Sequence, residues 1–313
     1  CFGTGNTTGT VSLFPGVQVD GIEIDKNVLS LAHHFSKWNH NAQRKKNIHM
    51  HIQDGRTFTR WTQNKYDVIT LEPMSPIQAG TVNLYSREFY QLAAERLNKG
   101  GLMMQWLPLH LVGPDDAKSI LKTFQEVYPH TSIWNSFLTR IVLLVGSKEE
   151  IALDKIRFEE LMRIPEIQNS AQQIGINTFL DFTDFFLTDA AEVRSFVQSA
   201  DLITDDRPLL EFSPVTLLPP LKLEVDETFL NYLKYRIGNY PQVRGMMPSE
   251  KRRWEKDFRT RTAQRLSIFS QRYHGPGESA FKKKNYSEGL GEVVTYLNKK
   301  KGQPIRLKGI QWE

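Results

Sequence analysis

The chain has 313 residues, 40% of them hydrophobic, which is enough for one large or two smaller globular domains. No run of apolar residues approaches the ~18 that a membrane-spanning helix needs. The single cysteine, Cys1, excludes an internal disulfide framework and fits a reducing compartment such as the cytoplasm.

The chain opens on a glycine-rich turn, Cys1 to Gly9, and Glu23 stands at the end of the apolar run that follows. Glycine adopts positive φ readily and lets the backbone approach a ligand closely. Backbone amides at the start of the next helix favour anionic groups, and a carboxylate about one half-unit later can accept hydrogen bonds from two ribose hydroxyls. Gly3, Gly5 and Glu23 therefore predict a nucleotide or nucleoside site. An ordinary strand-to-helix turn has a similar pattern.

In a doubly wound fold this glycine turn follows the first strand, and no strand sequence precedes it here. We therefore expect the chain to begin inside its domain, without the central first strand. That strand would lie between residues 18–24 and 66–71. A structure should show a gap beside these two runs, or their collapse onto one another.

Residues 18–146 alternate between runs typical of strands and runs typical of helices. Predicted strands cover 18–24, 48–53, 66–71 (a buried strand), 102–107 and a closing antiparallel pair at 131–135 and 140–146; predicted helices cover 26–38, 86–97 and 115–127. Strands separated by helices predict an α/β fold, with a doubly wound, mostly parallel Rossmann-like sheet that is covered on both faces.

The alternation ends with residue 147, so we predict a first domain over 1–147. Residues 148–225 should continue it with helical and extended segments, and residues 226–313 should form a basic helical tail. The tail holds 19 Lys and Arg against 9 Asp and Glu, whereas the whole chain has a net charge of only +5. Because these charges are interleaved, we interpret the tail as a solvated helical surface and expect no nucleic-acid partner.

Several segments of the chain stand in a specific order and spacing. They are Gly3-Thr4-Gly5, Glu23-Ile24-Asp25, Asp54-Gly55-Arg56-Thr57-Phe58, residues 66–76 with the sequence Tyr-Asp-Val-Ile-Thr-Leu-Glu-Pro-Met-Ser-Pro, and Leu84-Tyr85-Ser86-Arg87-Glu88-Phe89-Tyr90. Over about residues 1–146 this pattern resembles the spermidine synthase family, the polyamine aminopropyltransferases. Residues 204–212 also resemble a segment of larger bacterial relatives, in which a synthase-like domain follows a membrane region.

The resemblance implies the fold of class I S-adenosylmethionine-dependent methyltransferases and decarboxylated S-adenosylmethionine as the donor, without a metal. It implies that Gly3 and Gly5 line the sulfonium arm of the donor and that Glu23 binds the ribose hydroxyls. Asp54 would accept a hydrogen bond from the adenine amine, with the Gly55 backbone alongside. The alternatives are a solvated carboxylate at a strand end for Glu23 and an ordinary Asp-Gly turn for Asp54. Tyr85 and its aromatic neighbours are interpreted as core.

The family's acceptor site has two Asp, spaced Asp-x-x-Asp-Pro, at positions held here by Glu72 and Ser75. A carboxylate can hold a cationic amine, whose pKa is about 10, and take its proton during attack. Glu72 keeps the negative charge of the family's first Asp but holds it one methylene further from the backbone. Ser75 has no charge where the family has its second Asp. Because a misplacement of ~1 Å can cost on the order of 100-fold in rate, we expect an altered acceptor site. Gln105 aligns with a polar family residue near the acceptor; the alternative for it is a strand-end amide satisfied by the backbone.

The favoured function is aminopropyl transfer to a polyamine, with Glu72 as the base. A methyltransferase that uses intact S-adenosylmethionine is the first alternative, because loss of the second Asp would suit it. The second alternative is a module that binds the nucleoside without catalysis. The resemblance further implies a cytoplasmic domain, tethered to the inner membrane by a preceding region, and allows a homodimer. No metal-ligand spacing, Gly-x-Ser-x-Gly motif or phosphate-binding loop points elsewhere.

Overall fold

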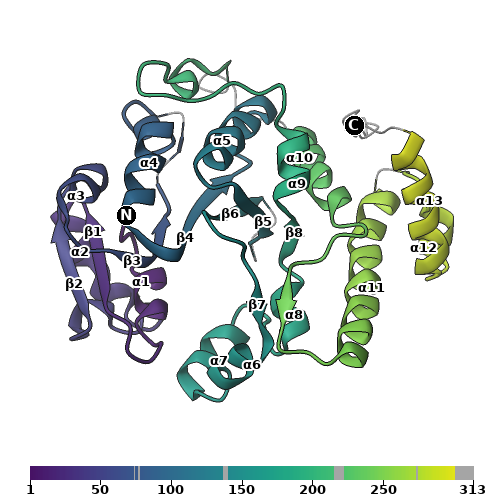
Figure 1. Cartoon of the computed structure of the whole chain (residues 1–313), viewed down its shortest axis with the longest axis horizontal. Coiled ribbons are helices and arrows are strands. Elements are labelled where there is room, and N and C mark those ends of the chain that lie inside the picture. Colours follow the sequence, from purple (N-terminus) through teal and green to yellow (C-terminus); the bar gives the residue numbers. More distant parts are fainter. Residues whose placement is uncertain (74, 77, 137–139, 215–221, 273, 300–313) are drawn as a thin grey trace.

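The computed structural model describes residues 1–73, 75–76, 78–136, 140–214, 222–272 and 274–299 (Figure 1). Its N-terminal half contains the helices α1 (Asn6–Val11), α2 (Lys26–Leu31), α3 (Gly55–Trp61), α4 (Arg87–Glu95) and α5 (Pro114–Val127), and the strands β1 (Val19–Glu23), β2 (Ile48–Ile52), β3 (Tyr66–Leu71), β4 (Leu97–Pro108), β5 (His130–Asn135) and β6 (Ile141–Ser147). The alternation of strands and helices that the sequence predicts is therefore confirmed.

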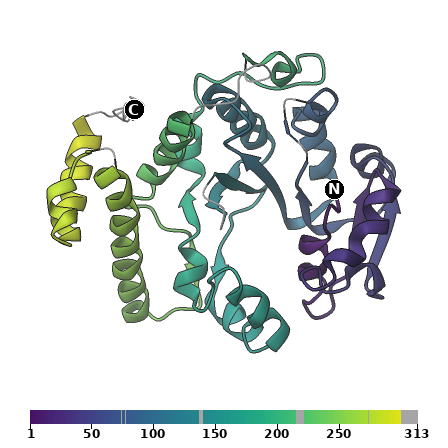
Figure 2. The same cartoon turned by 180° about the vertical axis from the view of Figure 1, so that it is seen from behind.

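The strands of this half form two sheets. β1 pairs with β2 in parallel, with Val19 opposite Ile48 and Glu23 opposite Ile52. The larger sheet has the order β3-β4-β6-β5-β8, where β8 is Phe186–Thr188. β3 and β4 are parallel, and β6 and β5 close the sheet in antiparallel pairs. With helices flanking these strands, the chain has the predicted α/β class (Figures 1 and 2).

The sequence predicts either a gap beside β1 and β3 or their collapse onto one another; the structure pairs each of them with another strand, and the missing first strand remains a prediction. Within the described residues no backbone ladder joins the two strands, which lie in different sheets. A side-chain contact links them instead, because the Tyr66 hydroxyl donates to the Asp20 carboxylate at 2.7 Å. The sequence prediction that β3 is a buried strand is wrong: Val68 is 51% exposed. The physical reason is that, among the residues that the structure describes, β3 pairs with β4 alone and forms an edge of its sheet.

The core lies between the larger sheet and the helices α4 and α5. Tyr85, Phe89 and Tyr90 are buried there, as the sequence predicts. The Tyr90 ring meets the Phe124 ring edge-on, with centroids 5.2 Å apart, which is a favourable geometry for aromatic pairs. Ser86 begins α4 by accepting a hydrogen bond from the Phe89 amide, and this cap fixes where the helix starts.

The C-terminal half wraps around the antiparallel end of the larger sheet (Figure 2). Its elements are β7 (Leu153–Asp154), α6 (Lys155–Leu161), α7 (Pro165–Gln172), α8 (Phe179–Thr183), β8, α9 (Ala190–Phe196), α10 (Lys222–Tyr235), β9 (Val243–Arg244), α11 (Pro248–Arg272), α12 (Glu278–Lys282) and α13 (Tyr286–Lys299). β8 pairs with β5, so a strand from beyond residue 147 extends the sheet. The division at 147 and 225 remains a prediction.

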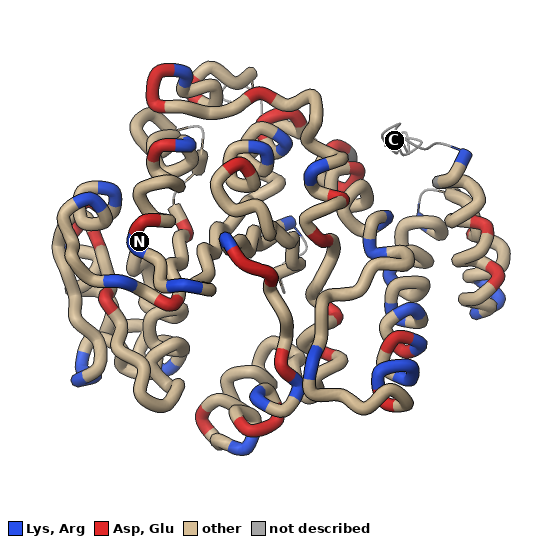
Figure 3. The backbone as a smooth tube through the Cα atoms, viewed as in Figure 1, with Lys and Arg blue, Asp and Glu red and all other residues tan. Residues whose placement is uncertain are grey.

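Acidic residues are interleaved with basic ones in the first part of α11, and the charged residues of the rest of the helix are basic (Figure 3). No helix in the described part of the chain is both long enough and apolar enough to cross a membrane. The apolar segment 179–186 packs with Trp134, Trp254 and Phe258 in a second hydrophobic cluster between α8 and α11.

Candidate nucleoside and acceptor site

Glu23 and Asp54 lie at the same edge of the small sheet. Because β1 and β2 are parallel and in register, with Glu23 opposite Ile52, both carboxyl ends point the same way. The Gln53 amide donates to the Glu23 carbonyl at 2.9 Å, which carries the pairing up to the residue before Asp54. In open α/β sheets, ligands bind at the carboxyl ends of strands.

The Glu23 side chain is 7% exposed and turned toward the glycine turn. One carboxylate oxygen accepts from the Phe2 amide at 2.9 Å and the Gly3 amide at 3.3 Å, and the other accepts from the amides of Ile24 and Asp25 at 2.9 and 3.2 Å. Glu23 is therefore not the solvated carboxylate of the alternative interpretation. It holds the turn and the end of β1 together.

The glycines of the turn are needed for its shape. Gly3 has φ +56° and Gly5 has φ +81°, and L side chains rarely adopt such values. A Cβ at Gly5 would also lie 2.4 Å from the Phe2 ring, whereas a Cβ at Gly3 would meet no atom within 4 Å. The turn is thus closed beneath Gly5 and leaves open space beside Gly3.

Asp54 is an exposed residue that begins α3. Its carboxylate accepts from the Thr57 amide at 2.7 Å, so the Asp-Gly pair is a helix start as well as a candidate adenine contact. A Cβ at Gly55 would meet no atom within 4 Å. The next residue, Arg56, crosses to another part of the chain: its guanidinium donates to the Asn83 carbonyl at 3.0 Å and forms a two-pronged ion pair with Asp205.

Glu72 directly follows β3, at the carboxyl end of the larger sheet. Leu71 stands opposite Gln105 of β4, which places Glu72 and Gln105 close together along this edge. Glu72 is exposed, and partial desolvation raises the pKa of its carboxyl.

Ser75 is half-buried, three residues after Glu72. Gln105 is fully buried, and neither its side-chain oxygen nor its nitrogen has a hydrogen-bond partner among the described residues. Burial raises the pKa of the Tyr85 hydroxyl. The alternative interpretation of Gln105 as a strand-end amide satisfied by the backbone is therefore wrong, because no backbone group of the described residues bonds to its amide.

Sequence reasoning assigned no role to Arg56, Asp205, Gly80 or Glu211. The Gly80 amide donates to the Glu211 carboxylate at 2.9 Å, and Arg56 binds Asp205 across 149 positions of sequence. No local pattern reveals either contact, although Arg56 and Asp205 both lie in segments that carry the family resemblance.

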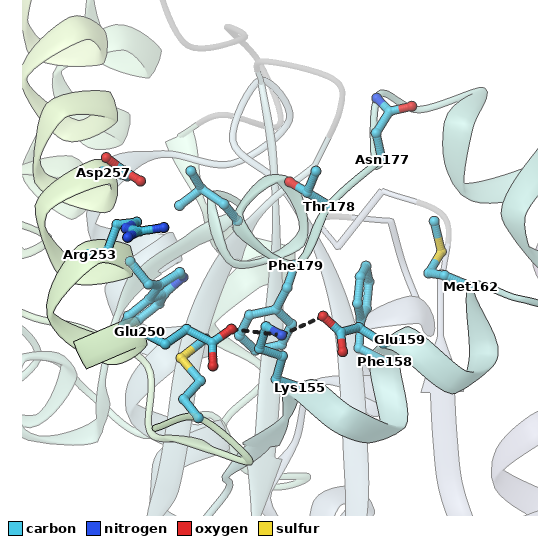
Figure 4. Close-up of a pocket in the computed structure, with 13 residues that line it drawn as sticks. Lys155, Phe158, Glu159, Met162, Asn177, Thr178, Phe179, Glu250, Arg253 and Asp257 are labelled. Carbon is cyan, nitrogen blue, oxygen red and sulfur yellow. Dashed lines mark hydrogen bonds and ion pairs between the residues drawn. The ribbon is translucent and has the colours of Figure 1, made fainter. Parts of the chain in front are cut away.

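A pocket of about 430 Å³ lies elsewhere, between α6, α8 and α11 (Figure 4). Lys155 lies in its floor and binds Glu159 and Glu250, the latter at 2.9 Å. These three side chains together carry a net charge of −1, and none of the predicted site residues lines the pocket. We interpret this pocket as the space left where α6 and α8 pack against α11.

Comparison with known proteins gives a family match. Residues 3–146 match the model of the spermine/spermidine synthase domain. Curated relatives called polyamine aminopropyltransferase include one from Saccharolobus solfataricus, 36% identical over 87 residues, and one from Nitrosomonas europaea, 30% identical over 114 residues. These matches cover 27% and 36% of this chain, and only 29% and 34% of the relatives' lengths.

Among solved structures, a probable spermidine synthase from Corynebacterium glutamicum is similar, with a TM-score of 0.45 and 19% identity. That likeness covers 64% of this chain and 69% of the other. The part of the chain that is similar to the spermine/spermidine synthase domain, residues 3–146, contains the motifs Gly3-Thr4-Gly5 to Tyr90 in their order.

Proposed function

We propose that the chain carries out aminopropyl transfer from decarboxylated S-adenosylmethionine to a polyamine. The observation that carries this proposal is the position of the candidate residues: Glu23 and Asp54 end or follow two paired parallel strands, and Glu72 follows a third. The family match over residues 3–146 supports it. In this proposal Gly3, Gly5, Glu23, Asp54 and Gly55 bind the donor, and Glu72, Ser75 and Gln105 form the acceptor side.

The reaction joins an acceptor amine nitrogen to the donor's propyl carbon next to the sulfonium. The carbon–sulfur bond breaks, the electron pair stays on sulfur, and a neutral thioether nucleoside leaves. The new ammonium group gives up a proton, for which Glu72 is the proposed acceptor. A carboxylate with a raised pKa is a better proton acceptor than one with the ordinary value, and partial desolvation raises the pKa of Glu72. The open space beside Gly3 and Gly55 leaves room for the donor.

The test is a product assay on the protein with decarboxylated donor and a diamine, triamine or tetraamine, read by mass spectrometry. We expect a mass gain of one aminopropyl group on the acceptor and release of the thioether nucleoside. Transfer to none of the three acceptors would refute the aminopropyl proposal. Membrane tethering and a homodimer remain predictions of the resemblance.

A methyltransferase is the second candidate, and Ser75 is the residue that favours it. Without a second carboxylate, the site has less to hold a multiply charged polyamine. Calorimetric titration with the intact and the decarboxylated donor separates the two candidates: preference for the intact donor, with methylated products, would favour the methyltransferase. Donor binding without any product would favour the non-catalytic module.

Replacing Glu23 by Ala should weaken binding of the donor nucleoside by roughly 10- to 150-fold, which corresponds to ~1.5–3 kcal/mol for a charged hydrogen bond. Calorimetry measures the dissociation constant. Because Glu23 also holds the turn through four amides, the thermal unfolding midpoint must be measured alongside, with Glu23→Gln as the conservative variant. Unchanged affinity in a folded Glu23→Ala protein would remove Glu23 from the site.

Replacing Ser75 by Asp should raise the rate with a diamine, because it restores the second negative charge at the position where the family has one. Initial rates at several diamine concentrations provide the comparison, with Ser75→Asn as a control of similar size and no charge. An equal response to Asn and Asp would show that charge at this position is not what limits the acceptor side.

A further inference from the structure

We infer that residues 201–213, which lie outside the family match, form a strap that positions both halves of the candidate site. Through Asp205 the strap holds the turn after Asp54, and through Glu211 it holds the loop after Glu72. Asp205 and Glu211 are thus positioning residues. The effect of these two residues on turnover rests on the proposed function. Their contacts are present in the structure whatever the function is.

The first contact of the strap is the ion pair between Asp205 and Arg56. Two guanidinium nitrogens meet the two carboxylate oxygens, one of them at 2.8 Å, and the Arg56 side chain is only 16% exposed. Hydrogen bonding to Arg56 is the largest cause of a lowered pKa at the Asp205 carboxyl. Two-pronged Arg–carboxylate pairs fix orientation as well as distance. Because Arg56 stands two residues after Asp54, the pair fixes the start of α3.

The second set of contacts ties the strap to the loop and helix that follow Glu72. The Arg87 amide donates to the Ile203 carbonyl at 2.9 Å, and the Asp205 amide donates to the Glu88 carboxylate at 3.0 Å. Further along, Glu211 accepts from the Gly80 amide at 2.9 Å. Gly80 has φ +80° and precedes the short helix Thr81–Leu84. The strap thus holds the loop at its middle and at its end.

The strap is itself anchored to α5. Ile203 is fully buried and its amide donates to the Thr123 hydroxyl at 2.9 Å. Leu210 is also fully buried, and Ser213 contacts the Asp116 carboxylate at the start of α5. With both ends held by the core of the larger sheet, Asp205 and Glu211 have fixed positions from which to orient their partners.

This arrangement matters because the small sheet has no backbone pairing with the larger one in the described residues. The candidate donor residues Glu23 and Asp54 lie on the small sheet, and Glu72 lies on the larger one. The ion pair of Arg56 with Asp205 reaches from α3, next to the small sheet, to a strap anchored on the larger sheet. Removing it should therefore loosen the donor turn relative to Glu72.

The first experiment measures binding of a thioether nucleoside, methylthioadenosine, by calorimetry. Asp205→Ala and Arg56→Ala should each raise the dissociation constant by about 5-fold or more. The double variant should be no weaker than the weaker single variant, because Asp205 acts through Arg56. Asp205→Asn keeps the size of the side chain and one acceptor oxygen, so its dissociation constant should lie between those of the unmodified protein and Asp205→Ala. Asp206→Ala and Asp201→Ala, exposed carboxylates of the same strap, are the matched controls and should bind as the unmodified protein does.

The second experiment is hydrogen exchange of the unliganded protein, which needs no activity. Asp205→Ala should speed amide exchange at Thr57 and Phe58, Glu211→Ala should speed it at Gly80, and Asp206→Ala should change neither. Unchanged exchange at these amides, or unchanged nucleoside affinity in folded Asp205→Ala, overturns the inference and leaves the proposed function standing. If the unmodified protein transfers no aminopropyl group but the exchange and affinity effects appear, the proposed function fails and the strap stands.

Discussion

Replacing Glu72 by Gln is expected to lower kcat for aminopropyl transfer by roughly 10²- to 10⁴-fold, the usual contribution of a general base. The amide has nearly the shape of the carboxylate but cannot take a proton. Binding of the donor should stay nearly unchanged, because the proposed donor contacts lie on the glycine turn, at the end of β1 and at the start of α3. Steady-state kinetics and calorimetric titration of the donor measure the two quantities separately.

The pH dependence gives a second check on Glu72. Its carboxyl must be ionised to accept the proton, so the rate should fall as the pH drops through its pKa. Because desolvation raises that pKa, the loss should begin above the usual range for Glu. In Glu72→Gln this loss of rate at low pH should vanish. Glu150→Gln, at an exposed carboxylate after β6, should keep both the rate and its pH dependence. A full rate in Glu72→Gln would assign the base to another group.

Replacing Arg236 by Met should lower the free energy of unfolding by ~3–5 kcal/mol, the usual cost of breaking a buried ion pair. The Arg236 side chain is 0% exposed and its guanidinium lies 4.0 Å from the Phe258 ring centroid. It donates to the Thr262 hydroxyl at 2.8 Å and the Phe186 carbonyl at 2.9 Å, and it binds Asp184 through carbonyl and carboxylate. Methionine can fill the space but donates no hydrogen bond, so the Thr262 hydroxyl and the Asp184 and Phe186 carbonyls lose this donor and the Asp184 carboxylate keeps only Arg261 and Arg265.

Denaturant titration measures this effect, and an exposed ion pair is the control. Arg244 binds Asp154 at 3.0 Å with 68% of its side chain exposed, so Arg244→Met should change stability by less than ~1 kcal/mol. Burial alone would raise the pKa of Asp184, but Arg236 and Arg265 together hold it below its usual value. The contribution of Asp184 is therefore complete above about pH 4 and is lost as the pH falls through its lower folded-state pKa. The deficit of Arg236→Met should accordingly shrink in acid, and a deficit that does not change with pH would point to packing alone.

The order of strands and helices could be read from the sequence because each element carries its own local pattern. The closing strands and α5 begin and end within a few residues of their predicted bounds. Burial of β3 could not be read in this way. Its apolar run predicts a buried strand, but the exposure of a strand depends on whether it has a neighbouring strand on each side. Among the described residues β3 pairs with β4 alone, and Val68 is exposed.

In the candidate site, too, some features follow from local sequence patterns and others depend on the folded arrangement. The edge shared by Glu23 and Asp54 follows from parallel strands, which sequence spacing reveals. The inward turn of Glu23 onto the Phe2 and Gly3 amides, and the ion pair of Arg56 with Asp205, depend on the folded arrangement of distant segments. No single-sequence pattern encodes which of the strap's acidic residues will face a given arginine.

The absence of backbone pairing between β1 and β3 in the described residues also makes ligand binding and stability thermodynamically linked. A nucleoside that touches Glu23, Asp54 and the surroundings of Glu72 would bind only the arrangement in which the two sheets are correctly placed. By mass action, such a ligand at 100 times its dissociation constant would stabilise that arrangement by ~2.7 kcal/mol, a large share of the ~5–15 kcal/mol that holds a typical domain folded. The bound nucleoside would then hold the two sheets in position relative to one another. A saturating concentration of nucleoside should therefore slow hydrogen exchange along β1 and β3 together.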